Sequence, residues 1–273
     1  MYKRYIDEKI VNKIGKGKAI IVVGPRQVGK TTLLKNILES KDYLFLDGDN
    51  PKVRSLLDNP NTEEIKNIIG KHKLVFIDEA QRIPGIGLTM KIITDQFKEV
   101  QLFTSGSSSF DLSNKINEPL TGRKWEYQLY PISWEEFENH HGYLYAEQQL
   151  EDRLLYGFYP DVLNNPGEEI SILKNLVNSY LYRDILAYSE IRKPEVLDKL
   201  VQALALQVGS EVNYTELSQI VNVDKNTISK YIDILQKGYV IFKLGSFSRN
   251  IRNEIKTNKK IYFYDNGVRN MVI

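Results

Sequence analysis

One segment of nine residues constrains the fold more than any other part of the sequence. Residues 24–32 read GPRQVGKTT and match the pattern GxxxxGK[ST]. The unbroken apolar run of residues 19–23 precedes the segment, and a helical pattern, LLKNILES, follows it. A buried strand, a glycine-bearing turn and a helix in this order predict a loop that binds phosphate groups.

The residue types in this loop suit a magnesium-bound nucleoside triphosphate. Glycines allow the main chain to turn tightly and bring N–H groups close to phosphate oxygens. We expect Lys30 to reach the β and γ phosphates and the Thr31 hydroxyl to coordinate Mg²⁺. The residues expected to line the nucleotide site are Gly24, Pro25, Arg26, Gln27, Val28, Gly29, Lys30, Thr31 and Thr32.

A second motif, LVFIDE at residues 74–79, is an apolar strand that ends in two acids. Such a pair is most often a solvated loop start, but beside a phosphate loop it predicts a catalytic edge of an α/β sheet. Asp78 would hold Mg²⁺ or its water shell. Glu79 would orient or deprotonate the water that attacks the γ phosphate.

Ser105 follows a further apolar strand, residues 101–104. If this strand lies between the strands that carry the two motifs, the Ser105 hydroxyl would sit near the γ phosphate and orient the attacking water. A serine–glycine turn without ligand contact is the alternative, and the sequence leaves both open.

Strands alternating with helices predict an α/β fold with a parallel sheet flanked by helices. Turn residues concentrate in residues 157–167, so we predict a boundary there: an ATPase domain over residues 1–165 and a mainly helical domain over residues 166–273. The predicted strands span residues 19–23, 43–46, 74–77, 101–104 and, more weakly, 125–130, and the predicted helices between them span residues 30–40, 62–70 and 88–98.

Composition excludes several other classes of protein. The sequence has no cysteine, which rules out disulfides, thiolate metal sites and a cysteine nucleophile within it. A formal charge of +2 gives no strong overall attraction to nucleic acid. No apolar run approaches the roughly 20 residues of a membrane span, and the N-terminus lacks the apolar core of a signal peptide. We therefore expect a cytoplasmic protein that does not enter a membrane.

The C-terminal part reads as a winged-helix pattern. A helix capped by Asn213, a second helix ending before Gly238, and two strands separated by a basic stretch follow one another. The module would bind double-stranded DNA or a protein partner, and Asp224 and Asp233 dilute the charge that DNA binding needs. The residues expected to face DNA are Lys225, Asn226, Thr227, Ser229, Lys230, Arg249, Arg252, Lys256, Lys259 and Lys260.

The strings GPRQVGKTT, LVFIDEAQ, TSGSSS, LTGR and YPISWEEF, with GFYP and KIYFYD further on, resemble the AAA+-like prokaryotic ATPases that carry a C-terminal domain of unknown function. The resemblance implies the strand order 5-1-4-3-2, ATP as the nucleotide and hydrolysis by Glu79. It also implies a homo-oligomer in which Arg123 acts as a finger, in its own or a neighbouring site, although a surface arginine is the alternative. Members of this group commonly continue into a nuclease-like region, and that activity is not carried over to this sequence.

Three whole-protein hypotheses remain open. The first is an ATPase whose nucleotide state moves the winged-helix domain. The second is a phosphotransferase that acts on a small molecule, and the third is a nucleotide-regulated DNA-binding protein with little hydrolysis. Intact Lys30, Thr31, Asp78 and Glu79 favour the first.

Overall fold

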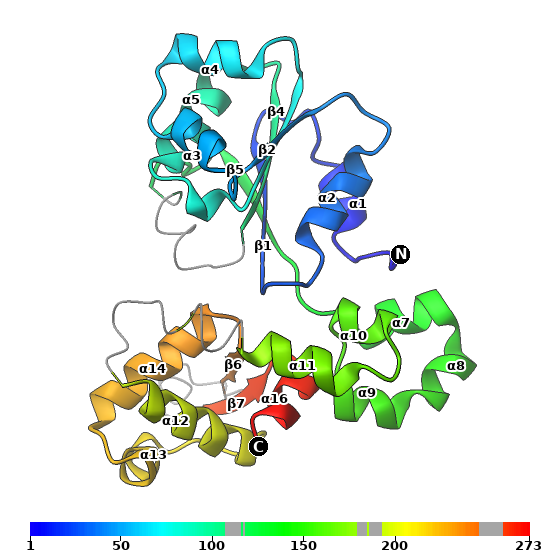
Figure 1. Ribbon diagram of the computed structural model, residues 1–273, viewed down its shortest axis with the longest axis vertical. Coiled ribbons are helices and arrows are strands. Elements are labelled where there is room, and N and C mark those ends of the chain that lie inside the picture. Colours follow the sequence, from blue (N-terminus) through cyan, green and yellow to red (C-terminus); the bar gives the residue numbers. More distant parts are fainter. Residues whose placement is uncertain (107–115, 117, 179–184, 186–192, 246–258) are drawn as a thin grey trace, which may run out of the picture. The chain divides into compact units, whose positions relative to one another are not determined.

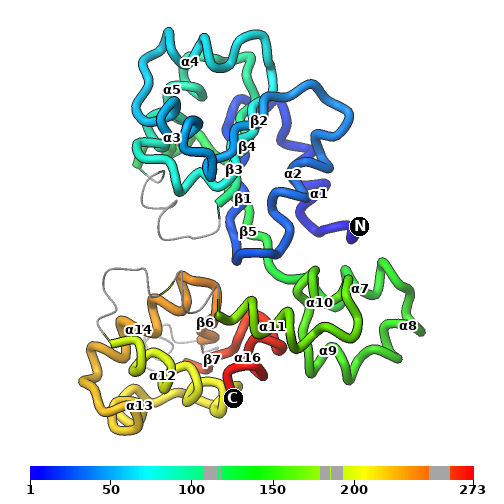
Figure 2. The backbone as a smooth tube through the Cα atoms, viewed as in Figure 1, coloured from blue at the N-terminus to red at the C-terminus, as the bar shows by residue number. Residues whose placement is uncertain are grey.

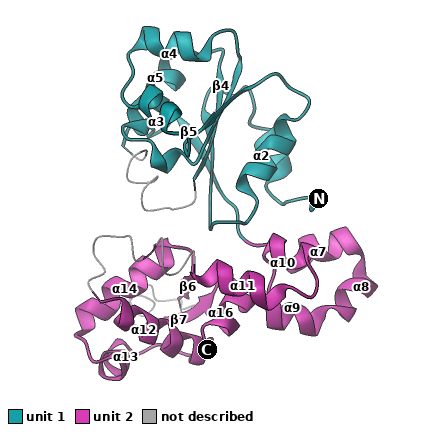
Figure 3. Ribbon diagram, viewed as in Figure 1, with its two compact units in different colours: residues 1–130 teal, residues 131–273 magenta. Residues whose placement is uncertain are grey.

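The computed structural model describes residues 1–273 except 107–115, 117, 179–184, 186–192 and 246–258. The chain forms two compact units, Met1–Tyr130 and Pro131–Ile273 (Figure 3), and Figure 2 traces the backbone through both. The boundary predicted at residues 165/166 lies inside the second unit, because the turn-rich segment of residues 157–167 packs within that unit.

The first unit is built on a parallel sheet with the strand order β2-β3-β4-β1-β5. This is the predicted strand order, 5-1-4-3-2. The unit has the P-loop NTPase fold, which confirms the predicted α/β fold class. Every residue of β1 and β4 is buried, as the unbroken apolar run of β1 predicts, whereas the edge strand β5 is partly exposed and had the weakest pattern. The strands are β1 (Ala19–Val23), β2 (Leu44–Asp47), β3 (Leu74–Asp78), β4 (Gln101–Gly106) and β5 (Lys124–Gln128).

Helices cover both faces of this sheet (Figure 1). Helices α1 (Asp7–Val11) and α2 (Lys30–Leu38) lie on one face, and α3 (Pro51–Leu57), α4 (Thr62–Ile69) and α5 (Ile86–Gln96) lie on the other. The three predicted helices are present as α2, α4 and α5. The sequence pattern missed α3, which begins at Pro51 after the side chain of Asn50 accepts a hydrogen bond from the Lys52 N–H.

Alternation along the strands divides the core between the two faces. Ile21 and Val23 of β1 and Val75 and Ile77 of β3 belong to the cluster that also contains Met90 of α5. On the opposite face, α2 turns its leucines inward, and Leu33, Leu34 and Leu38 are almost fully buried. Both layers fix the sheet, so the residues at its carboxyl edge are held in place by buried apolar packing.

The second unit contains helices and one small antiparallel sheet. A capping box between Ser133 and Glu136 opens α7, with N···O distances of 3.1 and 3.0 Å. Strands β6 (Ile241–Leu244) and β7 (Lys260–Phe263) pair antiparallel. The helices are α7 (Trp134–His141), α8 (Tyr143–Gln148), α9 (Leu150–Tyr156), α10 (Pro160–Asn164), α11 (Glu169–Val177), α12 (Pro194–Leu206), α13 (Tyr214–Val221), α14 (Lys225–Lys237) and α16 (Asn266–Met271).

Asp265 links two segments of the second unit that are far apart in the sequence. Its carboxylate accepts the Phe158 N–H at 2.7 Å and the Val268 N–H at 3.1 Å, which caps α16. Gly157 has no room for a Cβ atom, because that atom would lie 2.2 Å from Asp265 Oδ1. Burial raises the pKa of Asp265 to about 6. The GFYP segment (residues 157–160) and the YDNG segment (residues 264–267) are therefore in direct contact.

In the part of the chain that the structure describes, we find no helix with both the length and the apolar character that crossing a bilayer requires.

Candidate functional site

The loop between β1 and α2 adopts a conformation that two of its glycines make accessible. Gly29 has a φ of 92° and is the N-cap of α2, a left-handed conformation that favours glycine. A Cβ atom on Gly24 would lie 2.0 Å from the carbonyl oxygen of Leu129, so no larger residue fits there. The loop thus turns tightly against the end of β5. The first turn of α2 follows directly and faces the interior of the loop.

Arg4 holds this loop from outside, a contact that the sequence did not reveal. Its side chain is buried, and its guanidinium donates to the carbonyl oxygen of Val28 at 3.1 Å and to that of Tyr130 at 2.6 Å. A single side chain therefore ties the phosphate loop to the chain that follows β5. A bidentate contact of this kind suits the planar guanidinium group.

Lys30 lies inside the loop with 5% of its surface exposed. Its ammonium group donates to the carbonyl oxygens of Gly24 at 3.0 Å and Pro25 at 2.6 Å. Burial lowers the pKa of Lys30 to about 8, and the nearby carboxylates of Glu79 and Asp78 offset part of that shift. The structure therefore places a desolvated positive group where the sequence predicts polyphosphate binding.

The structure brings the side chains of Thr31 and Asp78, the two predicted magnesium ligands, into contact. The Thr31 hydroxyl lies 3.0 and 2.9 Å from the two carboxylate oxygens of Asp78, which has 7% of its surface exposed. These oxygens are hard donors of the kind that Mg²⁺ prefers. Among the residues that the structure describes, no group of three or more His, Cys, Asp or Glu side chains is arranged to hold a metal. The threonine–carboxylate pair therefore fits a cation that a nucleotide also coordinates.

Ser105 lies beside Asp78 because β4 separates β1 from β3. The buried Ser105 hydroxyl donates to the Asp78 carboxylate, and the Glu79 N–H approaches the same hydroxyl at 3.4 Å. The structure thus brings Ser105 to the predicted edge of the sheet. In this conformation its hydroxyl hydrogen is directed at Asp78. The serines at 107–109 lie outside the described residues.

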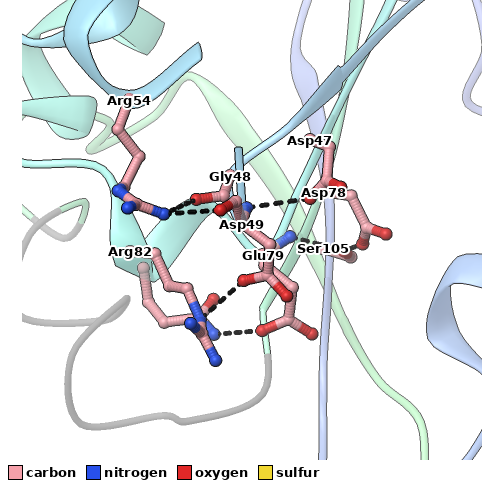
Figure 4. Close-up of polar contacts among 9 residues, drawn as sticks. Asp47, Gly48, Asp49, Arg54, Asp78, Glu79, Arg82 and Ser105 are labelled. Carbon is pink, nitrogen blue, oxygen red and sulfur yellow. Dashed lines mark hydrogen bonds and ion pairs between the residues drawn. The ribbon is translucent and has the colours of Figure 1, made fainter. Parts of the chain in front are cut away.

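Glu79, directly after β3, has an unusual backbone conformation, and Figure 4 shows it together with its polar neighbours. Its φ is 47° and ψ is 41°, a left-handed conformation that is uncommon for a residue with a side chain. The buried side chain of Gln81 donates its amide hydrogen to the Glu79 carboxylate at 2.5 Å. Strain at this turn and a fixed carboxylate are features found at catalytic positions.

The loop after β2 supports this turn, although no motif in the sequence assigns it to the site. The Gly48 N–H donates to the Asp78 carbonyl oxygen at 2.9 Å, and a Cβ atom on Gly48 would lie 2.5 Å from the Glu79 carbonyl oxygen. Asp49 forms an ion pair with Arg82 at 2.7 Å (Figure 4). The signal was present in the sequence as Asp-Gly-Asp directly after the second strand.

Asp47, the last residue of β2, is in register with Asp78 of β3. Register-paired residues of parallel strands point to the same face of the sheet, so both aspartates face the same side of the carboxyl edge. One oxygen of Asp47 accepts the Asp49 N–H at 2.8 Å. Asp47 is therefore a second carboxylate beside the predicted magnesium site.

The structure does not bring Arg123 to the phosphate loop of its own chain. Arg123 immediately precedes β5, and its carbonyl oxygen accepts the Ala19 N–H at the start of β1. A strand of five residues spans about 16 Å, and the phosphate loop follows the opposite end of β1. The guanidinium instead forms an ion pair with Asp95 at 2.6 Å. Its place favours a surface role or a contact with another subunit.

The predicted DNA-facing residues are only partly described. Lys225 and Lys230 are exposed on α14, whose first turn is capped by Asp224. Asp233 of the same helix forms an ion pair with Lys243 at 2.5 Å, so this cation of β6 offsets the negative charge that Asp233 adds to α14. The predicted residues Arg249, Arg252 and Lys256 lie outside the described residues, while Asn226, Thr227, Ser229, Lys259 and Lys260 lie within them.

Comparison with known proteins matches both halves of the chain. Residues 16–138 match a family described as an AAA domain, and residues 147–273 match a domain of unknown function, DUF8612. An uncharacterized protein of Haemophilus influenzae is 26% identical over 277 residues, which cover 93% of this chain and 68% of that protein. An uncharacterized protein of Mycobacterium tuberculosis is 27% identical over 254 residues, covering 91% of this chain and 54% of that protein.

This chain therefore spans from about half to about two thirds of the length of those two relatives. Among solved structures, a Walker-type ATPase of Pyrococcus abyssi is similar, with a TM-score of 0.68 at 15% sequence identity. The match covers 100% of this chain and 96% of that chain. At this level of identity the likeness concerns the fold.

Proposed function

We propose that this chain, whose residues 16–138 match an AAA domain, hydrolyses ATP at the site between β1 and β3. The observation that carries the proposal is the Thr31–Asp78 contact at 3.0 and 2.9 Å next to the buried Lys30. A hydroxyl, a carboxylate and an ammonium group converge there beside free helix N–H groups. That combination suits a polyphosphate with a divalent cation.

Binding would replace the present partners of Lys30. Its ammonium group would exchange the carbonyl oxygens of Gly24 and Pro25 for oxygens of the β and γ phosphates, while N–H groups of the loop cradle the same phosphates. Negative phosphates attract the ammonium form more strongly than neutral carbonyls do. Residues Gly24 to Thr32 therefore supply both the shape and the charge of the phosphate site.

Thr31 and Asp78 would hold Mg²⁺, directly or through its water shell. When bound, Mg²⁺ neutralises negative charge on the phosphates and orients them for displacement. The Thr31 hydroxyl now lies against the Asp78 carboxylate, so both oxygens already face one point. Asp47 would add a further carboxylate to the water shell from the adjacent strand.

Glu79 would act as the general base for hydrolysis. The oxygen of a water molecule attacks the γ phosphorus, the bond to the β-phosphate oxygen breaks, and that oxygen leaves with ADP. Glu79 accepts the proton that the water loses. The Gln81 amide, which donates to Glu79 at 2.5 Å, would hold the carboxylate in the direction of the water. Ser105 would orient the Asp78 carboxylate or the water itself.

Phosphate release from ATP tests this proposal in the absence of any acceptor. Lys30→Ala should abolish binding and turnover, whereas Glu79→Gln should keep binding and lose about 10²- to 10⁴-fold in kcat. Lys41→Ala and Glu99→Gln are matched controls, because both side chains are exposed and lie outside the site. Turnover that appears only with an added metabolite would instead support a phosphotransferase. Equal turnover in wild type and Glu79→Gln would exclude Glu79 as the base.

We also propose that residues 194–263 form a winged-helix module that responds to the nucleotide. Three helices, α12 to α14, precede the antiparallel pair β6–β7, and Glu211 forms a β-bridge to Lys260. This order of elements supports the proposal. In such a module α14 would enter the major groove of double-stranded DNA, or the same face would contact a protein.

DNA affinity at rising salt separates these two partners. Phosphate contacts predict an affinity that falls steeply with salt and weakens further in Lys225→Ala and Lys230→Ala. Lys199→Ala on α12 is the matched control. A flat salt response, or no binding at low salt, would leave a protein partner. We also propose that the protein is cytoplasmic and that Arg123 acts across a subunit contact, since it lies at the other end of β1 from the phosphate loop of its own chain.

A further inference from the structure

Positive charge gathers at the amino edge of the parallel sheet, opposite the edge that carries the phosphate loop. All strands of a parallel sheet begin at the same edge, so the segments that lead into β3, β4, β1 and β5 lie side by side in that order. These segments, residues 70–73, 97–100, 12–18 and 123–124, contain eight lysine or arginine residues and one acid, Glu99. The whole chain has a formal charge of only +2, so its cations are concentrated at this edge.

The segments that lead into β1 and β3 carry lysines that no acid neutralises. Among the residues that the structure describes, none forms an ion pair with Lys16, Lys18, Lys71 or Lys73. Three of these side chains are exposed, and Lys18 is half-buried. By contrast, the two cations at the start of β5 each have an acidic partner, at 2.6 and 2.5 Å. The unneutralised charge therefore lies on both sides of β4.

Gln101, the first residue of β4, fixes the main chain of both lysine-bearing segments. Its buried side chain accepts the Gly15 N–H at 2.8 Å and donates to the carbonyl oxygen of Lys18 at 2.8 Å. Its main-chain N–H donates to the carbonyl oxygen of Lys73 at 2.9 Å. One buried residue thus joins the two segments, so their lysines extend from a preorganised support.

Trp125 of β5 supports the same surface from the other side. The ammonium groups of Lys13 and Lys18 lie 4.2 and 4.6 Å from the centre of its ring, within the range of cation–π attraction. The ring is therefore occupied by two cations. Sites for single-stranded nucleic acid use aromatic rings as platforms on which unpaired bases stack. This surface suits phosphate groups better than bases.

The side chains of this edge fit a nucleic acid backbone better than a protein or a bilayer. None of the large apolar side chains of the four segments is exposed. Protein interfaces are depleted of lysine and enriched in aromatic side chains, and helices that lie on a bilayer insert an apolar face. Neighbouring strands are about 4.8 Å apart, so the edge from β3 to β5 spans about 14 Å. A duplex carries about one charge per 1.7 Å of its axis, or about eight over that length.

We propose that the amino edge of the sheet binds the phosphate backbone of a double-helical nucleic acid through Lys16, Lys18, Lys71 and Lys73. The contacts are made to phosphates, so the binding is independent of base sequence. This surface is distinct from the α14 face and requires neither bound nucleotide nor a winged-helix module.

Fluorescence anisotropy of labelled DNA and RNA duplexes at rising salt tests the proposal on the full chain. On B-DNA, four phosphate contacts contribute a slope of about −3.6 to log K against log salt, which is about 150-fold in affinity between about 50 and 200 mM. A variant with all four lysines replaced by glutamine should lose this part of the slope. Its midpoint of thermal unfolding should stay at the wild-type value, since the replaced side chains have no acidic partner.

Two control variants separate the edge from other cations. The first removes the same charge elsewhere, by glutamine at four exposed lysines outside the surface, Lys52, Lys174, Lys193 and Lys199, and should keep the wild-type slope. The second combines Lys225→Ala with Lys230→Ala on α14 and should keep the part of the slope that the edge contributes. Whichever duplex, DNA or RNA, depends on the edge lysines is identified as the ligand.

Several results would overturn the proposal. One is the absence of duplex binding by wild type at low salt, and another is an unchanged slope in the edge variant. An equal loss of slope in the first control would assign the effect to total charge. Loss of all binding in the second control would assign it to α14. Tighter, edge-dependent binding of single strands, or binding of phosphatidylserine vesicles without either duplex, would also contradict a double-helical ligand.

Discussion

Lys30 offers a quantitative test because its surroundings fix the pH at which its ammonium group titrates. Burial lowers its pKa to about 8 in the protein without nucleotide. About half of the Lys30 side chains are then neutral at pH 8 and about nine-tenths at pH 9. Phosphate oxygens at the ammonium group favour its charged form. Binding of Mg·ATP should therefore restore the missing proton.

The expected magnitude follows from these fractions. Binding should take up about 0.5 proton at pH 8 and about 0.9 proton at pH 9. The dissociation constant should accordingly rise about fivefold between these two pH values. The triphosphate is fully ionised in this range and contributes no titration of its own.

Isothermal titration calorimetry in buffers of different ionisation enthalpy measures the proton uptake directly. Lys30→Arg is the control, because arginine stays charged throughout this range. The control should bind with no uptake beyond that of other groups such as the N-terminal amine. Wild-type binding without proton uptake at pH 9 would refute the reasoning, and so would equal uptake by Lys30→Arg.

Three further predictions concern other parts of the structure. Gln81→Ala should lower kcat for phosphate release while the dissociation constant of Mg·ATP stays unchanged, because the amide orients Glu79 and does not touch phosphate; an unchanged kcat would contradict this role. Gly48→Ala should lower the free energy of unfolding by about 1–3 kcal/mol in urea titrations, since its Cβ would lie 2.5 Å from the Glu79 carbonyl oxygen; full stability would mean that the turn yields freely. The pKa of Asp265 is raised to about 6, so between about pH 4 and 6 the folded second unit binds more protons than the unfolded chain does. The free energy of unfolding should therefore fall as pH rises through that window. Asp265→Asn should flatten this part of the stability profile, and an identical slope in the variant would contradict the role of Asp265.

The sequence predicted the positions of the residues that belong to local motifs, and their roles stay predictions. Gly24 to Thr32 form the loop that their spacing predicts, because strand, glycine turn and helix are contiguous in the chain. Asp78 and Glu79 lie at the carboxyl edge because a buried strand ends directly before Glu79. Ser105 joins them because the fourth strand lies between the other two. Each prediction needed only one element and its place in the sheet.

Contacts between distant segments were not predictable in the same way. Arg4 contacts Val28 and Tyr130, and no local pattern relates these three positions. Gly157 and Asp265 are brought together by packing of the second unit. The turn-rich segment of residues 157–167, which resembles a linker in the sequence, therefore makes internal contacts in that unit. Most of the segment that the sequence predicts as a wing, residues 246–258, lies outside the described residues, so the winged-helix assignment and its basic contacts stay predictions.

The position of Arg123 could have been worked out from the sequence. Arg123 stands before its strand, whereas the phosphate loop, Asp78 and Ser105 stand at or after the ends of theirs. In a parallel sheet those two kinds of position lie at opposite edges. The resemblance to ATPases with arginine fingers implies a role for this residue type, but the topology of the sheet decides which site Arg123 can reach. Within one chain, Arg123 and the phosphate loop are at opposite ends of β1.

The most direct test is a crystal structure of this chain with Mg²⁺ and a non-hydrolysable ATP analogue. The account predicts that Lys30 Nζ leaves the carbonyl oxygens of Gly24 and Pro25 and contacts the β and γ phosphates. It also predicts a metal ion held by the Thr31 hydroxyl, with Asp78 in contact with the ion or its water. An analogue bound elsewhere, or a bound triphosphate with Lys30 still on the two carbonyl oxygens, would contradict the account.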